Sequence, residues 1–191
     1  DNAPTVQADA IGTGYAAFTG GDYISLSDTT LDTDGNASIL FWSKRTEVSS
    51  QDAVLGDTTA NTYSILRFES DGTMDLISDN GVGDVASITL NSANSKNWHH
   101  YAIICTSGTV TAYQDGVSCT VTNPAMADNT TISLIGGAGP VPDKSFEGYL
   151  KNIGTWSGAL TQPQIQSIME KTYSELTASE KTSLVSWWGL D

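Results

Sequence analysis

The chain has 191 residues, which is enough for one domain with a sizeable core and too few for two. Its 22 acidic and 8 basic residues give a net charge of −14, and so acidic a surface repels nucleic-acid phosphates and anionic lipid headgroups. We expect no nucleic-acid partner. We also expect no membrane insertion, since no apolar run approaches the roughly 20 residues that a spanning helix needs.

The polarity of the chain is carried by Ser, Thr, Asn and Gly rather than by charge. Only 16% of the residues are charged, and 18 glycines are spread along the length. This composition suits short strands with hydroxylated outer faces and tight turns, and it is typical of proteins that act outside cells. The chain opens on Asp1, without a basic and apolar leader, which predicts a processed chain or a segment of a longer one.

Apolar and polar residues alternate with a period of two along most of the chain, broken by turn residues. Two turn dipeptides mark hairpins: Asp71-Gly72 joins TYSILRFES to TMDLIS, and Asp115-Gly116 joins TVTAYQ to VSCTVT. Further strands are predicted at Tyr15–Thr19, Tyr23–Ser27, Ala37–Arg45, Ala53–Leu55 and Val85–Leu90, in WHHYAIIC, and at Thr131–Ile135 and Phe146–Trp156.

One helix is predicted late in the chain, over residues 161–173. Thr161 is a good N-cap, and Gln164 three residues later completes a capping box. Thr177 and Glu180 form a second box, which starts a shorter turn.

Many strands of similar spacing with a single late helix predict an all-β fold. We expect an antiparallel β-sandwich, because two half-apolar sheets must cover each other. It should form one domain over residues 1–191, with residues 1–12 as an N-terminal extension and a closing strand, SLVSWWGLD, over residues 183–191.

Four segments carry a resemblance to a known family: FTGGDYISL, ILFWSKR, NWHHYAIICTSGTVTAYQDG and FEGYLKNIGTWSGALTQPQI. In this order they resemble the laminin G-like, concanavalin A-like pattern over residues 15–169. The resemblance implies a jelly roll and a non-catalytic domain that binds sugars, proteins or surfaces. The ending LTASEKTSLVSWW is also similar to modules of bacteriophage tail and coat proteins.

Some members of this family hold calcium at the rim of the sandwich, and the resemblance makes Asp22 a candidate calcium ligand. The family's late acidic pair falls on Lys151 and Asn152, so an ammonium group stands where a carboxylate is expected. Calcium prefers several oxygen ligands, usually with more than one carboxylate, and a lysine opposes it. We therefore expect that no cofactor is required.

Glycoside hydrolysis is the enzymatic alternative. Glu69, Asp71 and Asp75 resemble the acidic residues that some glucanases of this class place alternately on one strand. Asp71 belongs to a turn dipeptide, Asp75 then falls on the next strand, and the third carboxylate of the pattern is missing. The two histidines, His99 and His100, point to opposite faces of a strand and cannot share a metal. We expect no enzymatic activity.

Cys105 and Cys119 are predicted to be too far apart for a disulfide. If both hairpins are regular, Cys119 pairs near Ala112 and Ala112 pairs near Ile103. The two sulfurs then share a face but lie two strands apart, about 10 Å between backbones. The usual disulfide span is about 7 Å. We expect two buried thiols.

The tryptophans give the remaining indication of function. Trp42 and Trp98 lie in apolar strands and are predicted to be in the core. Trp187 and Trp188 are neighbours, so one should point outward, where it either stacks on a sugar or lies beneath the helix; both are candidate ligand-binding residues. We expect a recognition or adhesion module that binds a glycan or protein at an outer surface. The alternative is a structural virion protein, assembled with identical copies or a scaffold.

Overall fold

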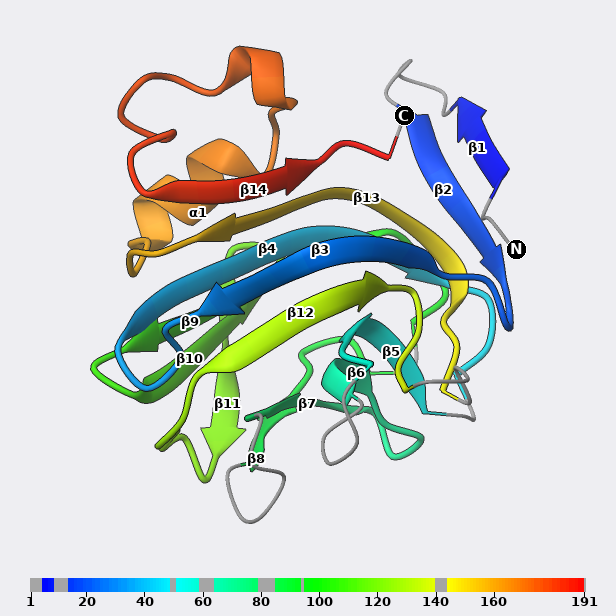
Figure 1. Ribbon diagram of the computed structural model, residues 1–191, viewed down its shortest axis with the longest axis horizontal. Helices are drawn as coiled ribbons and strands as arrows, with labels where there is room; N and C mark the ends of the chain where they lie inside the picture. The colour runs from blue at the N-terminus through cyan, green and yellow to red at the C-terminus, as the bar shows by residue number, and fades with distance from the viewer. Residues whose placement is uncertain are drawn as a thin grey trace.

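The computed structural model describes residues 5–8, 14–48, 51–58, 64–78, 85–93, 95–139 and 144–190. Within these ranges strands predominate, with one α-helix and one short 3-10 helix (Figure 1). The strands are β1 (Thr5–Ala8), β2 (Gly14–Thr19), β3 (Ile24–Leu31), β4 (Asn36–Arg45), β5 (Asp52–Gly56), β6 (Ser64–Phe68), β7 (Thr73–Ile77), β8 (Val85–Thr89), β9 (His99–Thr106), β10 (Thr109–Gln114), β11 (Val117–Thr122), β12 (Thr130–Ile135), β13 (Glu147–Trp156) and β14 (Leu184–Trp188); the helices are α1 (Gln162–Ile168) and the 3-10 helix Tyr173–Glu175.

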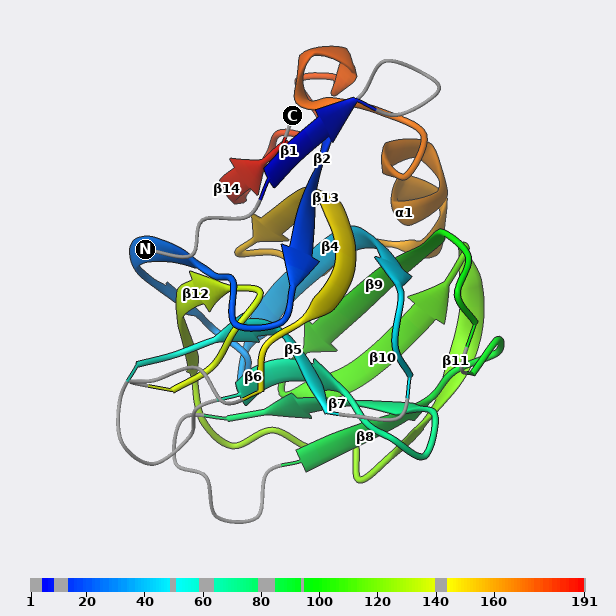
Figure 2. The same ribbon diagram turned by 90° about the vertical axis from the view of Figure 1, so that its right-hand side faces the viewer.

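The strands follow one hydrogen-bonded path, β1-β2-β13-β4-β9-β10-β11-β8-β7-β6-β5-β12-β3, with β14 added beside β13. The path folds over on itself, as Figure 2 shows. We call its first half, from β1 to β11 together with β14, sheet A, and its second half, from β8 to β3, sheet B. Every pairing between these strands is antiparallel, which confirms the predicted all-β sandwich.

Both predicted hairpins are present. β6 pairs with β7, and β10 pairs with β11. Asp115 and Gly116 have φ values of 54° and 72°, the left-handed conformation that a two-residue hairpin turn needs at both positions. The Asp-Gly dipeptide adopts this conformation at little cost, so the local sequence sets the register of β10 against β11.

The main core lies between the two sheets and is built from alternate residues of their strands. At its centre the rings of Phe41, Phe68 and Tyr101 contact one another, with centroids 5.2 to 6.4 Å apart. All three side chains are almost fully buried. Burying an aromatic side chain of this size stabilises a fold by roughly 2–3 kcal/mol. Contacts among these three rings therefore help to hold the two sheets together.

The cysteine prediction is confirmed. Ala112 pairs with Ile103 on one side and with Cys119 on the other, and Cys105 lies farther along β9. Both thiols are free and buried. Burial raises the pKa of Cys105 to about 12 and also raises that of Cys119, since a buried thiolate loses its hydration.

A second apolar cluster lies on the outer face of sheet A. Here residues 160–183, which we call the cap, cover the sheet (Figures 1 and 2). Helix α1 ends at Ile168, several residues earlier than predicted, because the next carbonyl turns to the sheet: the Met169 oxygen accepts a hydrogen bond from Trp42 Nε1 at 2.9 Å. The cluster contains Leu40, Ala102, Ile104, Trp156, Leu160, Ile165, Ile168 and Leu176.

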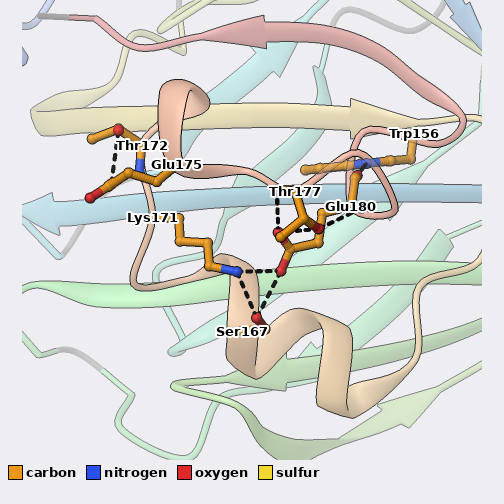
Figure 3. Close-up of polar contacts among 7 residues, drawn as sticks. All are labelled: Trp156, Ser167, Lys171, Thr172, Glu175, Thr177 and Glu180. Atoms are coloured by element: carbon orange, nitrogen blue, oxygen red, sulfur yellow. Dashed lines mark hydrogen bonds and ion pairs between the residues drawn. The ribbon is translucent and has the colours of Figure 1, made fainter.

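Glu180 fastens the cap together (Figure 3). Its carboxylate accepts hydrogen bonds from Thr177 N and Oγ1 at 2.8 and 2.9 Å, from Ser167 Oγ at 2.7 Å and from Lys171 Nζ at 2.6 Å. Its backbone oxygen accepts one from Trp156 Nε1 at 2.8 Å. The second predicted capping box is thus confirmed. The ammonium of Lys171 and the other donors hold the pKa of Glu180 at about 2.

Two elements near the ends of the chain complete sheet A. The predicted closing strand is present as β14, which pairs with β13. Strand β1 lies inside the segment predicted to be an extension and pairs with β2. In the described ranges no helix has the length and apolarity to cross a membrane.

Candidate functional site

Beyond the cap, the outer face of sheet A carries aromatic rings and lysines in adjacent rows. The register of β13, β4 and β9 places Lys151 opposite Trp42 and Trp42 opposite His100. In the next row Tyr149 lies opposite Lys44. We call this surface the aromatic–lysine face; it consists of Tyr15, Trp42, Lys44, Trp98, Tyr149 and Lys151.

Lys151 occupies the centre of the face. Its Nζ lies 5.0 Å from the ring centroid of Trp98 and 5.9 Å from that of Trp42, within the range of cation–π attraction. The rings of Tyr15 and Tyr149 meet edge to face at 5.0 Å, and Trp98 lies 5.8 Å from Tyr15. The four rings are half-buried, so part of each residue is open to solvent.

The prediction that Trp42 and Trp98 lie in the core is wrong. Phe41 points into the sandwich, and because side chains alternate along a strand its neighbour Trp42 must point outward. Trp98 precedes β9 and lies over Lys151. A buried indole N–H needs a hydrogen-bond acceptor. For Trp42 this acceptor is the Met169 carbonyl oxygen, which lies on the outer face of sheet A.

A shallow hollow separates the face from the cap. Its open space, mouth included, is about 170 Å³, and it encloses no void the size of a water molecule. His100 lies at this hollow, is 2% exposed, and has no partner for Nδ1 among the described residues. Burial lowers the pKa of His100 to about 4, so the ring is neutral at pH 7. The hollow is lined by Leu40, Trp42, His100, Asn152, Ile168, Met169, Lys171 and Trp187.

The two candidate ligand-binding tryptophans separate. Trp187 lines the hollow and packs edge to face on Trp156 at 6.2 Å, beneath the cap. Trp188 packs against the main core instead. Of the two, only Trp187 adjoins the aromatic–lysine face, and a role for either in ligand binding stays a prediction.

Asp22 serves the turn that follows β2. Its Oδ2 accepts hydrogen bonds from Thr19 N and Thr19 Oγ1, both at 2.8 Å. Nowhere in the described ranges do three or more metal-ligating side chains gather, and Lys151 lies within the aromatic–lysine face. The residues around Asp22 do not fit a calcium site by their donors; its role as a ligand stays a prediction.

The three candidate catalytic carboxylates form hydrogen bonds and ion pairs within the protein. Asp71 closes its turn by accepting hydrogen bonds from Thr73. Glu69 and Asp75 both pair with Arg67. Burial is the main cause that raises the pKa of Asp75, and the neighbouring carboxylate of Glu69 raises it further.

Sequence reasoning did not anticipate a chain of hydrogen bonds at the start of β9. His99 bridges Ser95 Oγ, 2.8 Å from Nε2, and Asp115 Oδ2, 2.6 Å from Nδ1. Asp115 also accepts from His100 N, and Ser95 Oγ accepts from Asn97 N. These bonds tie the loop before β9 to the Asp115-Gly116 turn and so hold Trp98 on the face.

Fold and surface together define a lectin-like β-sandwich. Residues 18–166 match the concanavalin A-like lectin/glucanases superfamily, and the chain belongs to this family. No curated protein matches the chain by sequence.

Solved structures share the fold at low identity. A candidate carbohydrate-binding protein of Bacteroides ovatus is 16% identical, with a TM-score of 0.65 over 88% of this chain and 49% of that one. The ligand-binding domain of botulinum neurotoxin serotype D, solved with N-acetylneuraminic acid, is 15% identical, with a TM-score of 0.61 over 87% and 44%. A heptameric pentraxin from Limulus polyphemus is 18% identical, with a TM-score of 0.55 over 80% and 79%. The chain spans about half the length of the first two.

Proposed function

We propose that this chain is a non-catalytic glycan-binding module at an outer surface, and that the aromatic–lysine face with its adjoining hollow is the binding site. The observation that carries the proposal is a group of three half-buried rings in mutual contact, Tyr15, Trp98 and Tyr149, with Lys151 over Trp98. Aromatic rings in a core are fully buried, and aromatic rings on a surface without a binding role are usually scattered singly. A surface cluster of rings therefore indicates a binding site.

The chemistry of the face suits a sugar. The apolar side of a pyranose ring can stack on an indole or phenol ring, and its hydroxyls need hydrogen-bonding groups beside the ring. The amide of Asn152, which is only half-buried, lies at the adjoining hollow. The relatives with carbohydrate-binding or sialic-acid-binding descriptions support this class of ligand.

The rival role, as a structural virion protein, requires a large apolar patch for contact with copies or a scaffold. In the described ranges only three large apolar side chains are highly exposed: Val117, Tyr173 and Val185. We therefore favour glycan recognition. Electron microscopy of the native material tests the rival directly, because a regular array of copies would support it.

A glycan array followed by titration tests the proposal. Stacking on one aromatic ring contributes about 1 kcal/mol, so Trp98→Ala should weaken binding of a hit about fivefold. Tyr173→Ala is the matched control, since Tyr173 is also an aromatic ring under a lysine, Lys181 at 4.4 Å, but lies on the cap. A chelator should leave the affinity unchanged. An array without hits, or equal losses in the two variants, would contradict the proposal.

A further inference from the structure

The lysines and arginines of this acidic chain differ in whether they form ion pairs. All eight lysines and arginines lie in the described ranges, against 22 acidic residues in the sequence. Arg45, Arg67 and Lys171 form ion pairs with carboxylates. Within the described part of the chain, four lysines have no carboxylate at ion-pair distance: Lys44, Lys96, Lys144 and Lys181.

Two of these four lysines, Lys44 and Lys96, lie beside Trp98. Lys44 follows Ser43, which pairs with His99, so the antiparallel register places Lys44 opposite Trp98. Its Nζ lies 5.7 Å from the Tyr149 ring centroid. Lys96 is exposed and precedes Trp98 by two residues in the same loop.

The one acidic residue of β13, Glu147, directs its carboxylate to the turn after β2. Glu147 is the next outward residue after Tyr149, and its carboxylate lies against Gly20 in the turn after β2. The aromatic–lysine face therefore combines cations with half-exposed rings on a protein whose net charge is −14. An anionic ligand is repelled by most of the surface and is attracted here, which steers its approach.

We infer that the aromatic–lysine face binds glycans that carry an acidic group, a carboxylate or a sulfate. The sugar ring stacks on Trp98 or Tyr149, and the acidic group lies near Lys44 and Lys96. A neutral sugar uses only the rings and hydroxyl contacts, so it binds more weakly. This inference rests on the proposed function and specifies its ligand.

Paired oligosaccharides test the inference by calorimetry. Sialyllactose and sulfated lactose are each compared with lactose in 50 mM and 500 mM salt. We expect at least roughly tenfold tighter binding of one charged sugar in low salt, and a smaller difference in high salt, where charges are screened beyond about 4 Å. The two charged probes separate a carboxylate ligand from a sulfate ligand.

Charge-removing variants locate the site. Lys44→Gln and Lys96→Gln should each weaken binding of the charged sugar by roughly threefold to fivefold, and should weaken binding of lactose less. Lys181→Gln, which also removes a lysine over an aromatic ring, is the control and should change neither. Equal affinity for charged and neutral sugars, or equal effects of the three variants, overturns the inference while the proposed function stands. Failure of every sugar to bind refutes the proposed function itself and the inference with it.

Discussion

Removing the charge of Glu180 tests directly whether its hydrogen bonds and ion pair stabilise the cap. Glu180→Gln keeps the shape of the side chain but removes its charge, and an amide NH₂ then faces one of the donors that now bond to oxygen (Figure 3). The side chain is 8% exposed, so water cannot replace these bonds without disturbing the cap.

The expected loss follows from the pKa of Glu180, which falls from its ordinary 4.5 to about 2 on folding. Such a fall corresponds to at most about 3 kcal/mol of stability at neutral pH. Lys171 is 25% exposed and therefore partly screened by water, so we expect Glu180→Gln to cost about 2 kcal/mol. Because the folded-state pKa is lowered, this contribution is complete above pH 4.5 and disappears as the pH falls toward 2.

Urea unfolding followed by tryptophan fluorescence measures this loss at pH 7 and pH 3. The difference between wild type and Glu180→Gln should be large at pH 7 and less than half as large at pH 3. Glu175→Gln is the control, since Glu175 makes the same capping-box contacts with Thr172 but is exposed, and its effect should be much smaller. A loss at pH 7 below about 0.5 kcal/mol, or one that does not change with pH, would refute the reasoning.

Three further properties follow from buried groups. Gly148→Ala should lower the melting temperature by roughly 6–12 °C, because φ is +146° and a Cβ would lie 2.2 Å from the Lys44 carbonyl oxygen, which costs about 3 kcal/mol; calorimetry with no shift would contradict this. The free energy of unfolding of the wild type should fall by about 2 kcal/mol between pH 7 and pH 5. The reason is that the pKa of His100 is 6.5 in the unfolded chain and about 4 in the folded chain, so protonation favours unfolding. In His100→Gln urea titrations should show that this loss is absent, and an equal loss would contradict the assignment. Cys105 and Cys119 should react with dithionitrobenzoate at pH 8 only after unfolding, and rapid reaction of the native protein would show that they are accessible.

Features set by neighbouring residues could be predicted from the sequence. The Asp115-Gly116 turn fixes β10 against β11, and that register was enough to place Cys119 two strands from Cys105. The capping box at Thr177 was visible for the same reason, since Glu180 is only three residues away. Strand alternation similarly located most of the sheet.

The aromatic–lysine face could not be predicted, because it depends on contacts between distant segments. Trp42, Trp98 and Lys151 meet only through the pairing of β13 with β4 and of β4 with β9. When both faces of a strand are partly buried, both carry apolar residues, and the sequence does not show which face points into the core. For this reason the sequence alone places Trp42 in the core. The partner that draws Trp42 outward, the Met169 carbonyl, exists only where the helix ends.

An irregularity in β13 decides where the binding face stops and the cap begins. The pairing of β13 with β4 shifts between Lys151 and Gly154, and Asn152 has a φ of 49°. Before the shift β13 pairs with β2, and after it with β14.

Gly154, just beyond the shift, makes room for the cap. A Cβ there would lie 2.6 Å from the ring of Trp156 and 2.8 Å from that of Trp187. The absent side chain therefore lets these two indoles pack edge to face against the sheet, under the cap. Lys151, on the other side of the bulge, lies over the half-buried rings of Trp42 and Trp98. Bulges commonly re-aim side chains beside functional sites. The same local distortion thus divides one sheet face into a part that stabilises the fold and a part that is open to a ligand.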